Sequence, residues 1–98
     1  MTCGAPRLLL LLMLWATPSL AAEMPPAGAS SCTGCHLPAN AKTVTSIPPI
    51  EGRDAATLQT MLEGFRSGAL PATLMNRIML GFSMEEISAL AQWFAKKS

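Results

Sequence analysis

Two cysteines and the only histidine of this 98-residue chain lie within five positions of one another, in the stretch SSCTGCHLP. They are Cys32, Cys35 and His36, and together they form the pattern C-x-x-C-H. Thiols and an imidazole at such spacings occur in structural zinc sites, redox-active dithiols, disulfides and sites of covalent haem attachment. Each of these would impose a different fold on the rest of the chain.

The first 22 residues are typical of a secretory signal peptide. Arg7 precedes an apolar run over residues 8–15, and small residues follow that run. The run is shorter than the roughly 20 residues that a membrane-spanning helix needs. We therefore expect residues 1–22 to be removed on export to the periplasm. Residues 23–98 would then form the mature domain, with no stable membrane insertion after cleavage.

Removal of the signal peptide changes the composition of the chain. Cys3 and Arg7 are lost, which leaves two cysteines and six basic against six acidic residues. Such a neutral chain lacks the basic stripe of nucleic-acid-binding proteins, so no nucleic acid is expected as a partner. A domain of this size has a marginal core, and this one has no tyrosine and only three phenylalanines. The composition therefore favours a large apolar cofactor inside the fold.

The four kinds of site make different demands on the cysteine–histidine cluster. A structural zinc ion takes four ligands, and the mature chain offers three Cys and His side chains, all in one turn. A thioredoxin-like dithiol belongs to a β–α–β unit, and a bare disulfide leaves His36 without a role. Covalent haem uses all three residues, with Cys32 and Cys35 bonded to the two vinyl groups and His36 to the iron. The sequence thus predicts one haem c.

The pattern of apolar residues predicts an all-α fold. A short helix is expected around Cys32, ending near Pro38. Prolines and a glycine punctuate residues 39–52, which are expected to form a loop.

Three further helices are expected in the C-terminal half of the chain. Asp54 would cap a helix that ends at Gly68, and a shorter helix would cover residues 72–80. Ser83 and Glu86 have the spacing of a capping box at the start of the last helix. The apolar stripe of that helix consists of Ile87, Leu90, Ala91 and Phe94.

A second axial ligand to the iron would come from a methionine, because the chain has no other histidine. Met24 lies in the N-terminal lead-in, Met61 in a core stripe, and Met84 in the first turn of the last helix. Met75 and Met79 lie one helical turn apart on the same face, so periodicity does not separate them. Proximity to the preceding loop favours Met75 only slightly.

Three segments of the chain resemble a small class I cytochrome c. They are CTGCH, IPPIEG and the block FRSGALPATLMNRIMLGFSMEEISALAQWFA. The closest resemblance is to the cytochrome subunit of flavocytochrome c sulfide dehydrogenases, and it extends from Cys32 to about residue 95. It implies the class I cytochrome c fold, all-α and wrapped around one covalently attached haem.

The resemblance also implies roles for individual residues. In that family the methionine ligand lies in a T-x-M segment, which identifies Met75 as the sixth ligand of the iron. The family also hydrogen-bonds the histidine ligand to a proline carbonyl. Here that carbonyl would belong to Pro48, with Pro49 as the close alternative, and the bond would fix the ring of His36.

The function implied by the resemblance is electron transfer. A flavoprotein sulfide dehydrogenase subunit would pass single electrons to this haem, and a soluble acceptor such as another cytochrome would receive them. The catalytic flavin would belong to the partner, so no bond chemistry is expected on this chain. The alternatives are a free-standing monohaem carrier to a terminal oxidase or reductase, and a haem sensor with an open sixth position.

Overall fold

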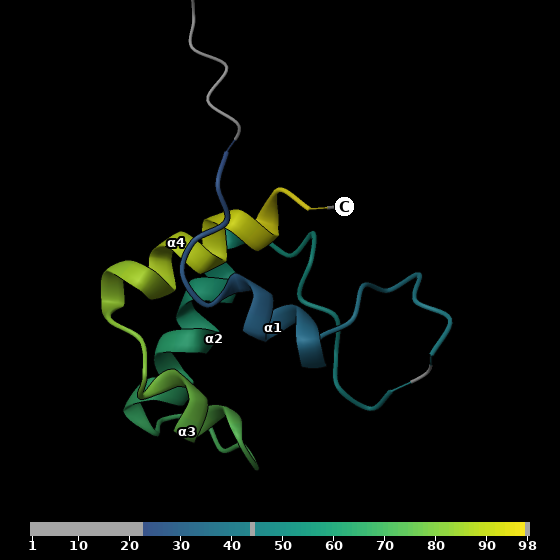
Figure 1. Cartoon of the computed structure of the whole chain (residues 1–98). Coiled ribbons are helices and arrows are strands. Elements are labelled where there is room, and N and C mark those ends of the chain that lie inside the picture. The colour runs from purple at the N-terminus through teal and green to yellow at the C-terminus, as the bar shows by residue number, and fades with distance from the viewer. Residues whose placement is uncertain (1–22, 44, 98) are drawn as a thin grey trace, which may run out of the picture.

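The computed structural model describes residues 23–43 and 45–97, so the predicted signal peptide over residues 1–22 lies outside the described residues. Within these ranges the chain forms four helices and no strand, which confirms the predicted all-α fold (Figure 1). The helices are α1 (Ala29–Cys35), α2 (Ala55–Ser67), α3 (Met75–Met79) and α4 (Met84–Ala95). None of the helices in this described part is long and apolar enough to cross a membrane.

Helix α2 begins and ends where its capping residues predict. The carboxylate of Asp54 accepts hydrogen bonds from the backbone N–H and the hydroxyl of Thr57, both at 2.9 Å. These bonds favour the charged carboxylate and hold the pKa of Asp54 below its usual value. At the other end Gly68 adopts φ 81°, a left-handed conformation that glycine adopts without strain.

Helix α4 carries the predicted capping box. The hydroxyl of Ser83 accepts from the backbone N–H of Glu86 at 3.1 Å, and the Glu86 carboxylate accepts from the backbone N–H of Ser83 at 2.8 Å. All four residues of the predicted apolar stripe are buried, namely Ile87, Leu90, Ala91 and Phe94. The local sequence signal and the packing therefore agree over the whole helix.

Helix α3 is shorter than the predicted helix over residues 72–80. It begins at Met75, and Leu74 before it has a non-helical φ of −132°. The backbone N–H of Leu70 donates to the carbonyl of Gly64 at 3.1 Å, which ties the connecting loop back onto α2. The chain must turn away from α2 before a new helix starts, so this tertiary contact overrides the helical tendency of residues 72–74.

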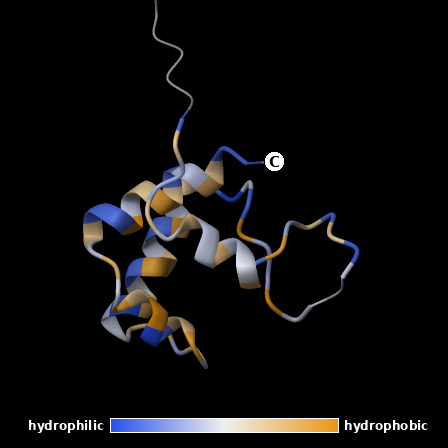
Figure 2. Cartoon of the chain, in the orientation of Figure 1, coloured by the Kyte–Doolittle hydropathy of each residue, from blue (hydrophilic) through white to orange (hydrophobic). Residues whose placement is uncertain are grey.

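Helix α2 is the centre of the helix packing, because it lies against both α3 and α4. Figure 2 shows apolar and polar patches alternating around the helices, as expected where each helix buries one face. Helix α1 has no comparable packing against another helix within the described residues. The buried core consists of Ala29, Leu58, Leu62, Met79, Ile87, Leu90, Ala91 and Phe94.

Helix α1 is held to the core at its first turn. Gly28 caps the helix with φ 86°, and Ala29 after it is buried. A Cβ atom on Gly28 would lie only 2.6 Å from Cζ of the Phe82 ring. Only a glycine combines this backbone conformation with so close an approach to Phe82.

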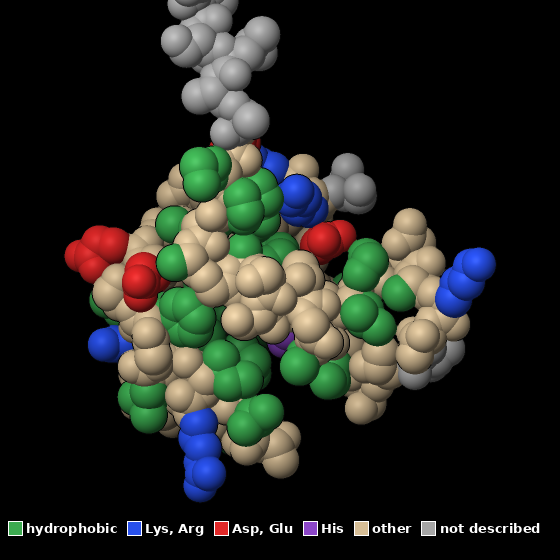
Figure 3. Space-filling view, viewed as in Figure 1, with side chains coloured by type: hydrophobic (Ala, Val, Ile, Leu, Met, Phe, Trp, Pro, Cys, Tyr) green, Lys and Arg blue, Asp and Glu red, His purple; other side chains and the backbone are tan. Residues whose placement is uncertain are grey.

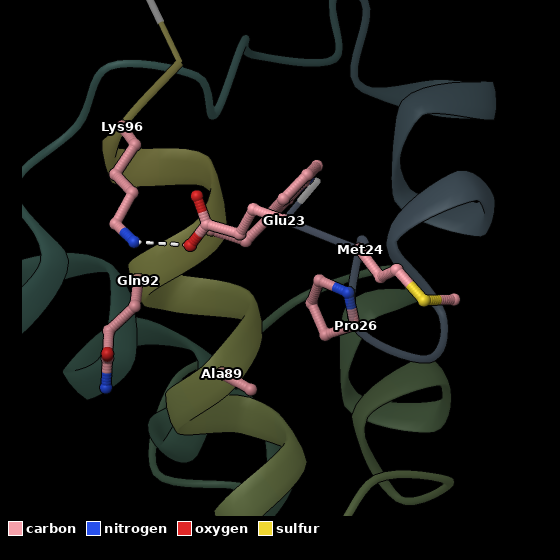
Figure 4. Close-up of a pocket in the computed structure, with 7 residues that line it drawn as sticks. Glu23, Met24, Pro26, Ala89, Gln92 and Lys96 are labelled. Carbon is pink, nitrogen blue, oxygen red and sulfur yellow. Dashed lines mark hydrogen bonds and ion pairs between the residues drawn. The ribbon is translucent and has the colours of Figure 1, made fainter. Parts of the chain in front are cut away.

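The lead-in before α1 crosses the outer side of α4 (Figure 4). The carboxylate of Glu23 accepts from Nζ of Lys96 at 2.6 Å, and both side chains are more than half exposed. An exposed ion pair of this kind contributes at most about 1 kcal/mol. A pocket of about 210 Å³ lies between the two segments, and its lining includes Met24, Pro26 and Trp93.

Substitution of Gly28 should destabilise the protein strongly. The methyl group of Gly28→Ala would meet the Phe82 ring, and alanine is strained at φ 86°. We expect a loss of at least about 2 kcal/mol in the free energy of unfolding, measured by denaturant titration of far-UV circular dichroism. Gly81→Ala is the control, because Gly81 lacks a positive φ and has only an ordinary contact at 3.4 Å. If the two variants had equal free energies of unfolding, the close contact between Gly28 and Phe82 would be contradicted.

Candidate cofactor site

A cavity of about 710 Å³ lies between α1, α2 and α3 and the loop that joins α1 to α2. Its volume falls within the range of ligand and cofactor sites. In the space-filling view a small patch of the histidine is visible, with apolar side chains near it on two sides and other atoms above it (Figure 3). The walls include the predicted site residues Cys32, Cys35, His36, Pro48 and Met75, together with apolar side chains such as Ile50, Leu58, Phe65, Ile78 and Phe82.

Both cysteines of the motif line this cavity from α1. Cys32 and Cys35 are three residues apart on the helix, so they lie on the same side of it. Cys32 is partly buried and Cys35 is exposed. Burial, together with the neighbouring Cys35, raises the pKa of the Cys32 thiol. The thiol of Cys32 is thereby favoured over its thiolate.

His36 leaves the helix as its C-terminal cap and turns its ring towards the following loop. Its Nδ1 lies 2.6 Å from the carbonyl oxygen of Pro48. A carbonyl only accepts hydrogen bonds, so Nδ1 must carry the proton and donate. The other ring nitrogen, Nε2, then keeps the lone pair that binds a metal ion. The imidazole is thus held in the tautomer that a metal ligand requires.

The loop that carries Pro48 is fixed by two further hydrogen bonds. Nε of Arg53 donates to the carbonyl of Pro49 at 2.9 Å, and the backbone N–H of Gly52 donates to the carbonyl of Phe94 at 2.9 Å. The second bond joins the loop to α4. Arg53 is partly buried and is the charged residue of the cavity wall.

The methionines separate into two groups in the structure. Met61, Met75 and Met79 line the cavity, whereas Met24 and Met84 are 84% and 44% exposed and lie outside its lining. Met79 is 2% exposed and belongs to the core, while Met75 is partly buried and packs against that core. Met75 is also the first residue of α3, next to the connecting loop.

The residues of the cavity wall fit a haem. Two thiols and an imidazole with a free Nε2 come from α1 and its cap, and three thioethers come from α2 and α3. The remaining wall is mainly apolar, as a porphyrin ring requires. Within the described ranges, no three His, Cys, Asp or Glu side chains gather as a metal-binding group.

Sequence reasoning identified the chemical groups of this site but missed residues that position them. Gly28 and Phe82 hold the start of α1, and Arg53 holds the loop of Pro48. A glycine directly before an expected helix is a weak signal for such a contact. Arg53 follows the IPPIEG segment, but no local pattern predicts that its side chain turns back to Pro49.

Comparison with known proteins gives two relatives. Over 69 residues the chain is 36% identical to the cytochrome subunit of sulfide dehydrogenase from Chlorobaculum tepidum. The matched segment covers 69% of this chain and 61% of that protein. Over 67 residues it is 36% identical to the thiosulfate dehydrogenase electron acceptor of Stutzerimonas stutzeri. This match covers 65% of this chain and 31% of that protein. No family model matches the chain.

The chain therefore matches less than two thirds of the length of either relative. The resemblance inferred from the motifs is nevertheless confirmed, since the chain is related to a cytochrome subunit of sulfide dehydrogenase. The four described helices agree with a fold of the cytochrome c kind.

Proposed function

We propose that this protein is an exported c-type cytochrome that carries single electrons on one haem. Cys32 and Cys35 would attach the haem covalently, and His36 and Met75 would ligate its iron. The observation that carries the proposal is that all four side chains line one cavity of about 710 Å³. A haem in that cavity supplies a one-electron ferric/ferrous couple, and His/Met ligation raises its potential.

Different residues of the cavity wall would hold different parts of the haem. Pro48 fixes the ring of His36 and raises its basicity through the hydrogen bond at Nδ1. The apolar side chains of the wall limit the access of water. Arg53 keeps guanidinium N–H groups beyond the one bonded to Pro49, and these suit a carboxylate at the edge of the cavity.

The names of the relatives support a place in a dehydrogenase system. One relative is a cytochrome subunit of sulfide dehydrogenase. By analogy, a flavoprotein subunit would oxidise sulfide and pass electrons singly to this haem, and a soluble acceptor such as another cytochrome would receive them. The other relative is a thiosulfate dehydrogenase electron acceptor, which favours a free carrier as the second candidate. In either role the protein would act in the periplasm, after loss of residues 1–22.

The haem should remain bound to the denatured polypeptide. After electrophoresis under reducing, denaturing conditions, the band should keep haem-dependent peroxidase staining, and the double variant Cys32→Ala/Cys35→Ala should lose it. Intact-mass measurement should show the mass of one haem and the absence of residues 1–22. Haem that acidified solvent extracts from the wild-type protein would contradict covalent attachment.

The thioether of Met75 should be the sixth ligand. Met75→Ala should abolish the weak far-red charge-transfer band of the ferric protein. It should also lower the reduction potential by on the order of 0.1 V, because axial ligands set haem potentials over roughly 0.8 V.

Two variants serve as controls for this assignment. Met84→Ala changes an exposed methionine outside the cavity wall, and Met79→Ala changes a core methionine. Both should keep the band. If Met79→Ala lost the band and Met75→Ala kept it, the ligand would be Met79, one helical turn after Met75. Retention of the band in all three variants would point to another thioether of the cavity wall, that of Met61.

The dehydrogenase role is tested by purification of the holoprotein from its native cells. A flavin-containing chain should co-elute with the cytochrome on size exclusion, and addition of sulfide should reduce the haem of that complex. The separated cytochrome should be reduced by sulfide much more slowly. Elution of the cytochrome alone, without flavin, would favour the free carrier.

A further inference from the structure

The loop between α2 and α3 leads directly to Met75. Within the described residues, Pro71, Ala72 and Thr73 form no backbone hydrogen bond, and all three line the cavity. Methionine also has three rotatable side-chain bonds, so its sulfur is poorly fixed unless its backbone is held. The position of Met75 therefore depends on contacts at the two ends of this loop.

One side chain closes the loop at both ends. Nδ2 of Asn76 donates to the carbonyl of Phe65 at 2.9 Å and to the carbonyl of Leu70 at 2.8 Å. Phe65 lies in the last turns of α2, and Leu70 lies in the loop. Asn76 is partly buried and directly follows Met75 in α3. Its amide thus joins the helix before the loop, the loop itself and the start of the next helix.

A close approach between Gly64 and Leu70 supports the same arrangement. The backbone N–H of Leu70 donates to Gly64, and a Cβ atom on Gly64 would lie 2.8 Å from Cγ and Cδ1 of Leu70. This contact seats the first part of the loop on α2. The second part, from residue 71 to Met75, is tied to Phe65 and Leu70 by the two hydrogen bonds of Asn76, and Met75 itself packs against the core.

We propose that Asn76 is a positioning residue that holds the thioether of Met75 in place as an iron ligand. The inference rests on the proposed function, because it takes Met75 as that ligand. Loss of the two hydrogen bonds would loosen the second part of the loop, residues 71–75, and Met75 would leave the iron more often. Asn76 would act through the backbone of its neighbour, without contact with the iron.

The test compares variants of the ferric holoprotein by their rate of binding imidazole, a neutral ligand that replaces a dissociated methionine. Asn76→Ala removes the amide, and Asn76→Asp keeps its shape but removes both N–H donors. Each variant should bind imidazole about tenfold faster than the wild type, which corresponds to about 1.4 kcal/mol. The far-red band should also disappear at a lower temperature, while the helices measured by far-UV circular dichroism persist.

Gln92→Ala is the matched control, because Gln92 is an exposed amide on α4 whose one hydrogen bond among the described residues goes to the Ser88 hydroxyl at 3.1 Å. It should bind imidazole at the wild-type rate. Rates within about twofold of wild type in both Asn76 variants would overturn the proposal, as would a wild-type rate in Asn76→Asp alone. A wild-type protein that lacks the far-red band would instead overturn the proposed ligand, and the present inference with it.

A second measurement needs no substitution. In the wild-type protein the side-chain amide protons of Asn76, followed by nuclear magnetic resonance, should exchange with solvent more slowly than those of the exposed Asn40. Binding of imidazole should accelerate the exchange of Asn76 only. Equal exchange at the two asparagines would contradict the closed loop, even if the variants do not fold.

Discussion

An apolar cavity of about 710 Å³ separates α1 from the packed helices α2 and α3, and the rest of the structure is arranged around it. Protein interiors rarely leave voids much larger than a water molecule, so a cavity of this size marks a binding site for a large apolar group. The core beside it is small and is formed mainly by α2 and α4. Contacts with a bound group would therefore contribute to the stability of the domain as well as to its function.

Two separate sets of contacts hold the two ligand candidates, His36 and Met75. His36 is fixed by Pro48, whose loop is held by Arg53 and by the bond from Gly52 to α4. Met75 is held by a different set of contacts, those of the loop between α2 and α3. Rigid support of this kind suits electron transfer, because a site that changes little between two oxidation states needs little reorganisation. The structure supplies that support mostly with backbone carbonyls as hydrogen-bond acceptors.

The sequence predicted those parts of the fold that depend on neighbouring residues. Asp54 and the pair Ser83 and Glu86 act on the first turn of their own helices, so their patterns located α2 and α4 correctly. The start of α3 was wrong by three residues, because it depends on the contact between Leu70 and Gly64 across the end of α2. No periodicity or capping signal describes such a contact.

The same distinction applies to the site. Cys32, Cys35 and His36 are close together in the sequence, and all three line the cavity. The contact between Gly28 and Phe82 joins residues far apart in the chain, so sequence reasoning could not find it. The motif that supplies the chemical groups is local in the sequence. The contacts that orient these groups join residues far apart in the chain, so no local pattern predicts them.

The three methionines of the cavity illustrate why packing must decide between candidates with equal chemistry. Met79 is 2% exposed, so its sulfur could approach an iron atom only by leaving contacts with the core. Met61 lies within the 13-residue helix α2, whose backbone has little freedom to turn the side chain. Met75 lies at the junction of loop and helix, where a change in loop conformation moves the sulfur with little loss of core packing. Of the three, Met75 lies next to a loop and is only partly buried against the core, and this combination supports it as the proposed ligand.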